Sequence, residues 1–191
     1  MQNLKMITLI GVNHTTAKEE VEGILSFIPY YDLLLLEYDS YRKNRKLWQK
    51  LSFLSFLQYL LMRLNGIKKP PFEIWSNAGK KLNKDVRYID RLPKELLKNG
   101  KVNLRAILKD IKNDMEILLR KRDMLMSEEI IKINIKNPNK SMLIVVGLAH
   151  LAGITEIITE FIPNIKIMYS KRGAKMLEQV NRIIDKNAKI T

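Results

Sequence analysis

Five short apolar runs recur along the chain, and helical patterns separate most of them. The runs are continuous or nearly so rather than alternating, as expected for parallel strands that are covered on both faces. They predict strands at residues 6–10, 33–36, 86–89, 142–146 and 165–168. Strands that alternate with helices are typical of α/β domains. We therefore expect one layered domain over residues 1–191, with a central, largely parallel sheet flanked by helices.

The predicted helices are read from apolar residues that recur at three- and four-residue intervals. The first begins near residues 15–16, where "TAKE" has the form of a capping box, and ends at Ile28 before Pro29. Further helices are predicted over residues 41–65, 72–82, 103–134, 152–161 and 172–186.

Composition narrows the class of protein. The chain has no cysteine, which excludes disulfides, thiolate metal sites and thiol nucleophiles. The N-terminal sequence "MQNLKMITLIGVNH" lacks the layout of a signal peptide, so we expect a soluble, cytoplasmic protein. The most hydrophobic long segment, residues 47–66, is interrupted by Lys50, Gln58 and Arg63. It predicts an amphipathic helix rather than a transmembrane segment. The helix is expected to be buried or to form an interface between copies of the chain, and contact with a membrane surface is the alternative.

The net charge of +14 is compatible with an anionic partner. The lysines, however, are spread over every segment, and no RNP-type sequence, zinc finger or clear helix-turn-helix pattern accompanies them. We therefore expect a solvated basic surface and no specific nucleic-acid site.

Both histidines of the chain follow a predicted strand in the same local frame. His14 ends "LIGVNH" and His150 ends "VVGLAH", so each lies three residues after a glycine. The alternative is that each is an ordinary histidine at a strand end, hydrogen-bonded to backbone. If the frame is functional, the glycines at 11 and 147 permit tight turns and close approach of the backbone.

Charged residues follow the other predicted strands. Glu37 and Arg42 come after the second strand, and Asp90 and Arg91 come after the third. Because the carboxyl ends of parallel strands meet at one edge of a sheet, where α/β proteins bind ligands, we expect these residues to converge with both histidines.

Such a cluster suits metal-assisted hydrolysis. Imidazole and carboxylate ligands favour zinc, manganese, iron or cobalt, so a divalent ion is expected on His14, His150 and Glu37. A metal held there would lower the pKa of a bound water, and Glu37 would act as a ligand or as the general base. The arginines would pair with the carboxylates or bind a substrate oxyanion.

At these residues the sequence resembles the TraB/PrgY family, which is related to the Tiki metalloproteases and to the erythromycin-esterase/ChaN-like fold. The resembling segments arrive in family order and span residues 6 to about 170: "LIGVNH", "LLLLEYDSYR", "PPFE", "YIDR", "KRDMLM" and "VVGLAH". The chain departs from the family pattern at Lys121, where an acidic residue is usual, and in "PPFE", which lacks the family's glycine.

The resemblance implies a fold with two related halves, each contributing one histidine. In the Tiki branch it implies metal-dependent proteolysis, which assigns the metal to His14, His150 and Glu37. The supporting residues that it implies are Arg42, Asp90, Arg91, Arg122 and Asp123. Without the resemblance, Arg122 and Asp123 are equally well explained as a solvated pair on a helix.

Two functions follow from this comparison. The first is a metal-dependent hydrolase that acts on a peptide or small-molecule substrate. The second is a non-catalytic regulatory protein that sequesters a peptide, haem or an anionic ligand, as the TraB/PrgY branch is associated with limiting the activity of peptide pheromones.

Overall fold

The computed structural model describes residues 5–12, 18–37, 70–90, 97–98, 101–102 and 115–169. Within them, five strands form one all-parallel sheet in the order β3-β2-β6-β1-β7. These strands are β1 (Ile7–Val12), β2 (Leu33–Leu36), β3 (Asp85–Tyr88), β6 (Met142–Gly147) and β7 (Lys166–Tyr169). The predicted α/β class and the parallel sheet are confirmed, and each predicted strand overlaps one of the five.

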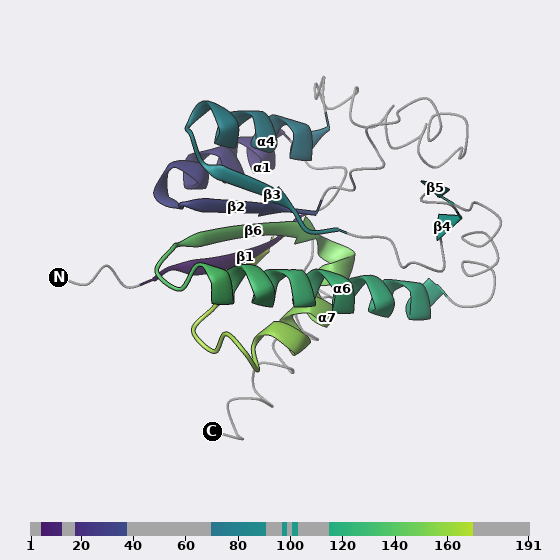
Figure 1. The fold of residues 1–191 in the computed structure, drawn as a ribbon. Helices are drawn as coiled ribbons and strands as arrows, with labels where there is room; N and C mark the ends of the chain where they lie inside the picture. The colour runs from purple at the N-terminus through teal and green to yellow at the C-terminus, as the bar shows by residue number, and fades with distance from the viewer. Residues whose placement is uncertain are drawn as a thin grey trace.

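In the part of the chain that the structure describes, four α-helices and a short 3-10 helix accompany the sheet. They are α1 (Lys18–Phe27), the 3-10 helix η1 (Ile28–Tyr30), α4 (Pro71–Lys81), α6 (Met115–Lys136) and α7 (Leu148–Ile158). Helices α1 and α4 cover one face of the sheet, and α6 and α7 cover the other (Figure 1).

The central strands β1, β2 and β6 are nearly continuous apolar runs because both of their faces are buried, whereas the edge strands β3 and β7 are only partly buried and include polar residues. Leu35 and Ile144 pack in the core beneath α6 and α7, whereas Leu34 and Val145 pack in the core beneath α1 and α4. Each core is therefore supplied by alternate residues of the same strands.

Three elements differ from the sequence prediction. Pro29 does not end the helical segment, because it lies in the first turn of η1, where its missing N–H is not needed. An antiparallel pair, β4 (Leu97–Lys98) and β5 (Lys101–Val102), was not predicted, although the intervening sequence Asn-Gly favours a hairpin.

The third difference affects the site. Helix α7 begins at Leu148 rather than at residue 152, so His150 lies in its first turn and not in a loop. Gly147 is the N-cap without a side-chain cap bond. Leu148 and Leu151 hold this turn against β1, because a Cβ atom on Gly11 would lie 2.7 Å from Leu151 Cδ2 and 3.2 Å from Leu148 Cδ1. The glycine thus lets α7 start close to the sheet.

The connections of β1 and β6 define a topological switch point. These two strands are neighbours, with Val12 paired to Gly147 at their carboxyl ends. The chain reaches β2 from β1 through α1 on one face, and it reaches β7 from β6 through α7 on the other. Ligands of open α/β sheets bind where neighbouring connections diverge in this way.

The helices described by the structure include none that is long and apolar enough to cross a membrane.

Candidate functional site

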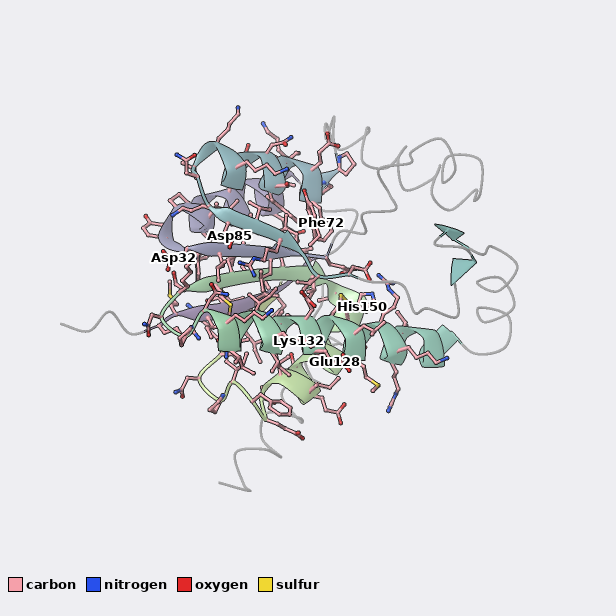
Figure 2. The ribbon with its side chains drawn as sticks, in the orientation of Figure 1. Asp32, Phe72, Asp85, Glu128, Lys132 and His150 are labelled. Carbon is pink, nitrogen blue, oxygen red and sulfur yellow. The ribbon has the colours of Figure 1, made fainter. Side chains whose placement is uncertain are left out.

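Five of the predicted site residues come together at the carboxyl edge of the sheet. They are Glu37 after β2, Asp90 after β3, Arg122 and Asp123 on α6, and His150 on α7. Figure 2 shows His150 at the opposite end of the sheet from Asp32 and Asp85. The other three predicted residues, His14, Arg42 and Arg91, lie outside the described residues.

The strand ladders continue one residue past β2 and β3 and thereby fix the two strand-end carboxylates. The backbone N–H of Glu37 donates to Val145 O over 2.9 Å. The N–H of Ile89, next to Asp90, donates to Leu36 O over 3.0 Å. Both side chains are buried, with only 3% of Glu37 and 7% of Asp90 exposed.

Arg122 joins these two carboxylates. Its Nε and Nη2 donate to the two oxygens of Asp90 over 3.2 and 2.7 Å, which is a bidentate pair. The same Nη2 also donates to Glu37 Oε1 over 3.2 Å. Burial works to lower the pKa of the Arg122 guanidinium, but the nearby charges of Asp90, Glu37 and Asp123 outweigh it and raise the pKa overall. The side chains of Arg122 and Asp123 are only 18% and 7% exposed, so the alternative of a solvated surface pair is wrong.

Glu37 is the residue on which the contacts converge. Its Oε2 accepts the backbone N–H of Gly147, the N-cap of α7. Its Oε1 accepts from Arg122 and lies 3.5 Å from His150 Nε2. A carboxylate at a helix N-terminus is also favoured by the helix dipole. One side chain at the end of β2 thus contacts α6 and the start of α7.

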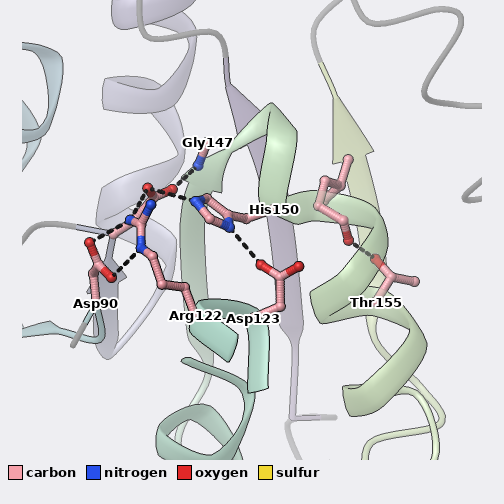
Figure 3. Close-up of polar contacts among 8 residues, drawn as sticks. Asp90, Arg122, Asp123, Gly147, His150 and Thr155 are labelled. Atoms are coloured by element: carbon pink, nitrogen blue, oxygen red, sulfur yellow. Dashed lines mark hydrogen bonds and ion pairs between the residues drawn. The ribbon is translucent and has the colours of Figure 1, made fainter. Parts of the chain in front are cut away.

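His150 is oriented by Asp123, as Figure 3 shows. The distance between His150 Nδ1 and Asp123 Oδ1 is 2.5 Å, and both side chains are buried. In the tautomer that carries its proton on Nδ1, the imidazole donates to this carboxylate oxygen and leaves Nε2 free to accept or to bind a ligand. This fixes the ring orientation and directs Nε2 toward Glu37.

Gly153 provides the space that Asp123 occupies. A Cβ atom at this position, one turn along α7 from His150, would lie 2.2 Å from Asp123 Oδ2 and 2.9 Å from its Cγ. Any side chain there would displace the carboxylate from the imidazole. Gly153 therefore belongs to the site although it carries no functional group.

The donor set can be compared with the divalent ion expected from the sequence. The separation of 3.5 Å between His150 Nε2 and Glu37 Oε1 exceeds the length of a normal N–H···O hydrogen bond. It is close to the roughly 3.4 Å between two ligands that share one tetrahedral ion. An Asp carboxylate on the far nitrogen of a histidine is also typical of metal ligands. The two side chains thus fit a metal, although the described residues include no group of three or more His, Asp or Glu arranged to hold one.

Two parts of this site were not predicted as such. The N–H of Gly147 binds Glu37, and the sequence offered only a glycine after an apolar run as a sign of it. Gly153 entered only as a glycine following the second histidine motif, and its role depends on how closely α6 and α7 pack.

No protein-family model, curated protein or solved structure matches this chain. The resemblance to the TraB/PrgY family therefore stays a prediction that depends on the sequence motifs. Function has to be inferred from the geometry at the carboxyl edge.

Proposed function

We propose that the protein is a metal-dependent hydrolase, with peptides as its most suitable substrates, and that its site lies between Glu37 and His150. The observation that carries the proposal is the approach of His150 Nε2 to Glu37 Oε1 at the carboxyl edge, with Asp123 fixing the ring from the other side.

The location of the pair supports the same conclusion. Gly147 ends β6 and His150 follows it at the switch point, where α/β folds bind ligands. The sequence continues β1 with residues 13–17, which carry His14 in the matching Gly-x-x-His frame. In the proposal, two related halves of the fold each contribute one histidine to a shared site.

The roles follow from the contacts. His150, Glu37 and His14 would hold a divalent zinc, manganese, iron or cobalt ion, which when bound supplies Lewis-acid activation of water and of a scissile carbonyl. Asp123 holds the tautomer of His150 that presents Nε2. Arg122 holds Glu37 and Asp90 in place. Glu37 would also act as the general base, because a carboxylate close to the attacking water accepts its proton.

The proposal is tested by metal content and hydrolysis of a peptide library with untagged protein. We expect near-stoichiometric metal in the wild type, and loss of metal together with a roughly 10²–10⁴-fold drop in hydrolysis in His150→Ala and Glu37→Gln. His14→Ala should behave in the same way if both histidines share one site. The matched control is Glu156→Gln, an exposed carboxylate on α7, which should leave both readouts unchanged.

Absence of metal after reconstitution, together with unchanged hydrolysis in His150→Ala, would contradict the proposal. The substitution Asp123→Asn tests the orientation of His150 separately from a general loss of protein stability. An amide in contact with Nδ1 permits the other tautomer, so this variant should lose metal affinity by roughly 10–100-fold while it stays folded.

A second function is favoured by the completeness of the buried network. Every side chain of the described cluster contacts another member of it, as expected in a protein that keeps the fold without the chemistry. In that case the protein would sequester a peptide, haem or an anionic ligand. A Soret band in the visible spectrum after incubation with haem would identify the haem-binding form, and peptide binding without turnover would identify the sequestering form.

A further inference from the structure

The amino edge of the sheet, opposite the candidate site, exposes one large apolar side chain in the connection leading into each strand. These residues are Met6 before β1, Tyr30 before β2, Leu82 before β3, Ile135 before β6 and Phe161 before β7. Their exposed fractions run from 40% for Met6 to 73% for Tyr30. The five strands begin within one residue of one another in register, so these connections share one side of the molecule.

Lysines accompany the apolar residues along the same edge. Lys84 and Lys140 shortly precede β3 and β6, and Lys166 is the first residue of β7. Lys80 and Lys136 lie in the last turns of α4 and α6, where the helix dipole also favours them. The dipole does not explain the lysines next to the strands.

Three acidic groups of the described residues lie on the same side, and two of them, Asp32 and Asp85, interact electrostatically with Lys140. Asp85 is paired with Arg87 over 2.6 Å, and Asp32 accepts hydrogen bonds from Ser141. Glu160, after α7, is the third carboxylate on this side. We define the amino-edge surface as Met6, Tyr30, Leu82, Ile135 and Phe161 with the lysines at 80, 84, 136, 140 and 166.

We propose that the amino-edge surface docks on an anionic lipid membrane. Apolar side chains that enter the headgroup region and lysines that bind anionic lipids are the two components of peripheral membrane binding. The apolar residues occur in all five connections, which matches a broad planar partner better than a narrow groove. Charge complementarity selects an anionic membrane over a neutral one.

The side-chain types favour a membrane over a nucleic acid. Three of the five apolar residues, Met6, Leu82 and Ile135, are not aromatic and do not stack on bases. The cations are mostly lysines, which lack the bidentate geometry of arginine. Docking by this edge leaves the carboxyl edge, with His150, facing the aqueous phase (Figure 2). The inference does not depend on the proposed hydrolase activity.

The experiment measures co-sedimentation of the full chain with vesicles of equimolar phosphatidylcholine and phosphatidylglycerol, and with vesicles of phosphatidylcholine alone. We expect binding to the mixed vesicles only. Replacing Lys140 and Lys166 together by serine should weaken the partition coefficient roughly 25-fold, about fivefold for each lysine. The double variant Ile135→Ser and Phe161→Ser should weaken it by about tenfold or more, because both apolar anchors are lost.

Matched controls remove the same side-chain types elsewhere. Met124, on α6, is 56% exposed, and Lys18, on the first turn of α1, has a side chain that is 72% exposed. Met124→Ser with Lys18→Ser should leave vesicle binding unchanged. Circular dichroism of each variant verifies that the fold is retained.

A tryptophan probe tests insertion directly. In Phe161→Trp, the emission of the new side chain should shift to shorter wavelength on mixed vesicles, beyond any shift of the wild type, because the ring leaves water. Absence of binding to the mixed vesicles would overturn the proposal. Binding that persists in the Ile135→Ser and Phe161→Ser double variant, without a spectral shift in Phe161→Trp, would also overturn it and indicate a general polyanion surface that nucleic acid would occupy equally well.

Discussion

At each end of the β2–β6 strand pair, a carboxylate next to β2 accepts a backbone N–H from β6 or the residue before it. At the amino end, Asp32 precedes β2 and accepts the backbone N–H of Ser141, which precedes β6, over 2.8 Å. At the carboxyl end, Glu37 follows β2 and accepts the backbone N–H of Gly147, the last residue of β6. Each carboxylate thus ties the flanking residue of one strand to the other.

The surroundings of the two carboxylates differ. Asp32 is exposed, and it also accepts from the hydroxyl of Ser141 and interacts electrostatically with the lysines at 84 and 140. Glu37 is 3% exposed, and its other oxygen faces Arg122 and His150. A buried charge is costly unless it is paired, so Glu37 requires the partners that Asp32 does without. Because Glu37 is buried, its strand-end hydrogen bond is part of a larger polar network, whereas that of Asp32 is not. Three substitutions test this difference.

The largest effect is expected from Arg122→Met at the buried end. The substitution keeps most of the side-chain volume but removes the guanidinium that Asp90 and Glu37 both contact. Removal of one partner from a buried ion pair costs roughly 3–5 kcal/mol. Urea unfolding should report this loss. Lys121→Met, at an exposed position of the same helix, should change the free energy of unfolding by only about 0.5 kcal/mol.

Equal stability losses at Arg122 and Lys121 would show that the buried network contributes nothing beyond a surface charge.

A smaller effect is expected from Gly153→Ala. The new Cβ atom would lie 2.2 Å from Asp123 Oδ2, so either the carboxylate moves away from His150 or α7 shifts. Overpacking of this kind costs about 1–3 kcal/mol. The control is Gly23→Ala on α1, where no atom lies within 4 Å of the position that the new methyl group would take. There, alanine should stabilise the protein by about 0.5–1 kcal/mol, because it favours helix more than glycine does.

If Gly153→Ala is as stable as Gly23→Ala, then Asp123 does not approach α7 as closely as the structure has it. The orientation of His150 by Asp123 would then lose its geometric basis.

The sheet and part of the site were predictable from local sequence. Apolar runs identified all five strands of the sheet, most clearly the central strands β1, β2 and β6, whose residues are buried on both faces. Glu37 and Asp90 were predicted to converge because they immediately follow parallel strands. Both inferences use only neighbours in sequence and the common direction of the strands.

Local sequence patterns could not predict which residues of the site contact one another. Arg122 contacts Asp90 and Glu37 because α6 passes beside the ends of β2 and β3, a long-range arrangement that no spacing in the sequence encodes. The start of α7 was also missed, because Gly147 supplies no side-chain cap. Gly153 acquires its role only once α6 and α7 are packed together.

The smallest effect is expected at the exposed end, from Asp32→Asn. The hydrogen bond from the Ser141 hydroxyl, followed by the one from its backbone N–H, lowers the pKa of Asp32. A carboxyl whose folded pKa is lowered stabilises the protein above its unfolded pKa of about 4, and this stability disappears as the pH falls through the folded value. At neutral pH the variant should therefore lose about 1 kcal/mol, a modest figure because Asp32 is exposed to solvent.

The difference between Asp32→Asn and wild type should vanish in acid, since both side chains are then neutral. A double-mutant cycle with Ser141→Ala, followed by urea unfolding at neutral and acidic pH, isolates the contact from other effects of the substitution. Glu37→Gln supplies the comparison at the other end of the strand pair and should cost more at neutral pH, because its carboxylate also faces Arg122 within the buried network. Equal losses in the free energy of unfolding for the two substitutions would show that burial does not make the contact of Glu37 stronger than that of Asp32. Glu37 would then serve only to join β2 to β6, as Asp32 does.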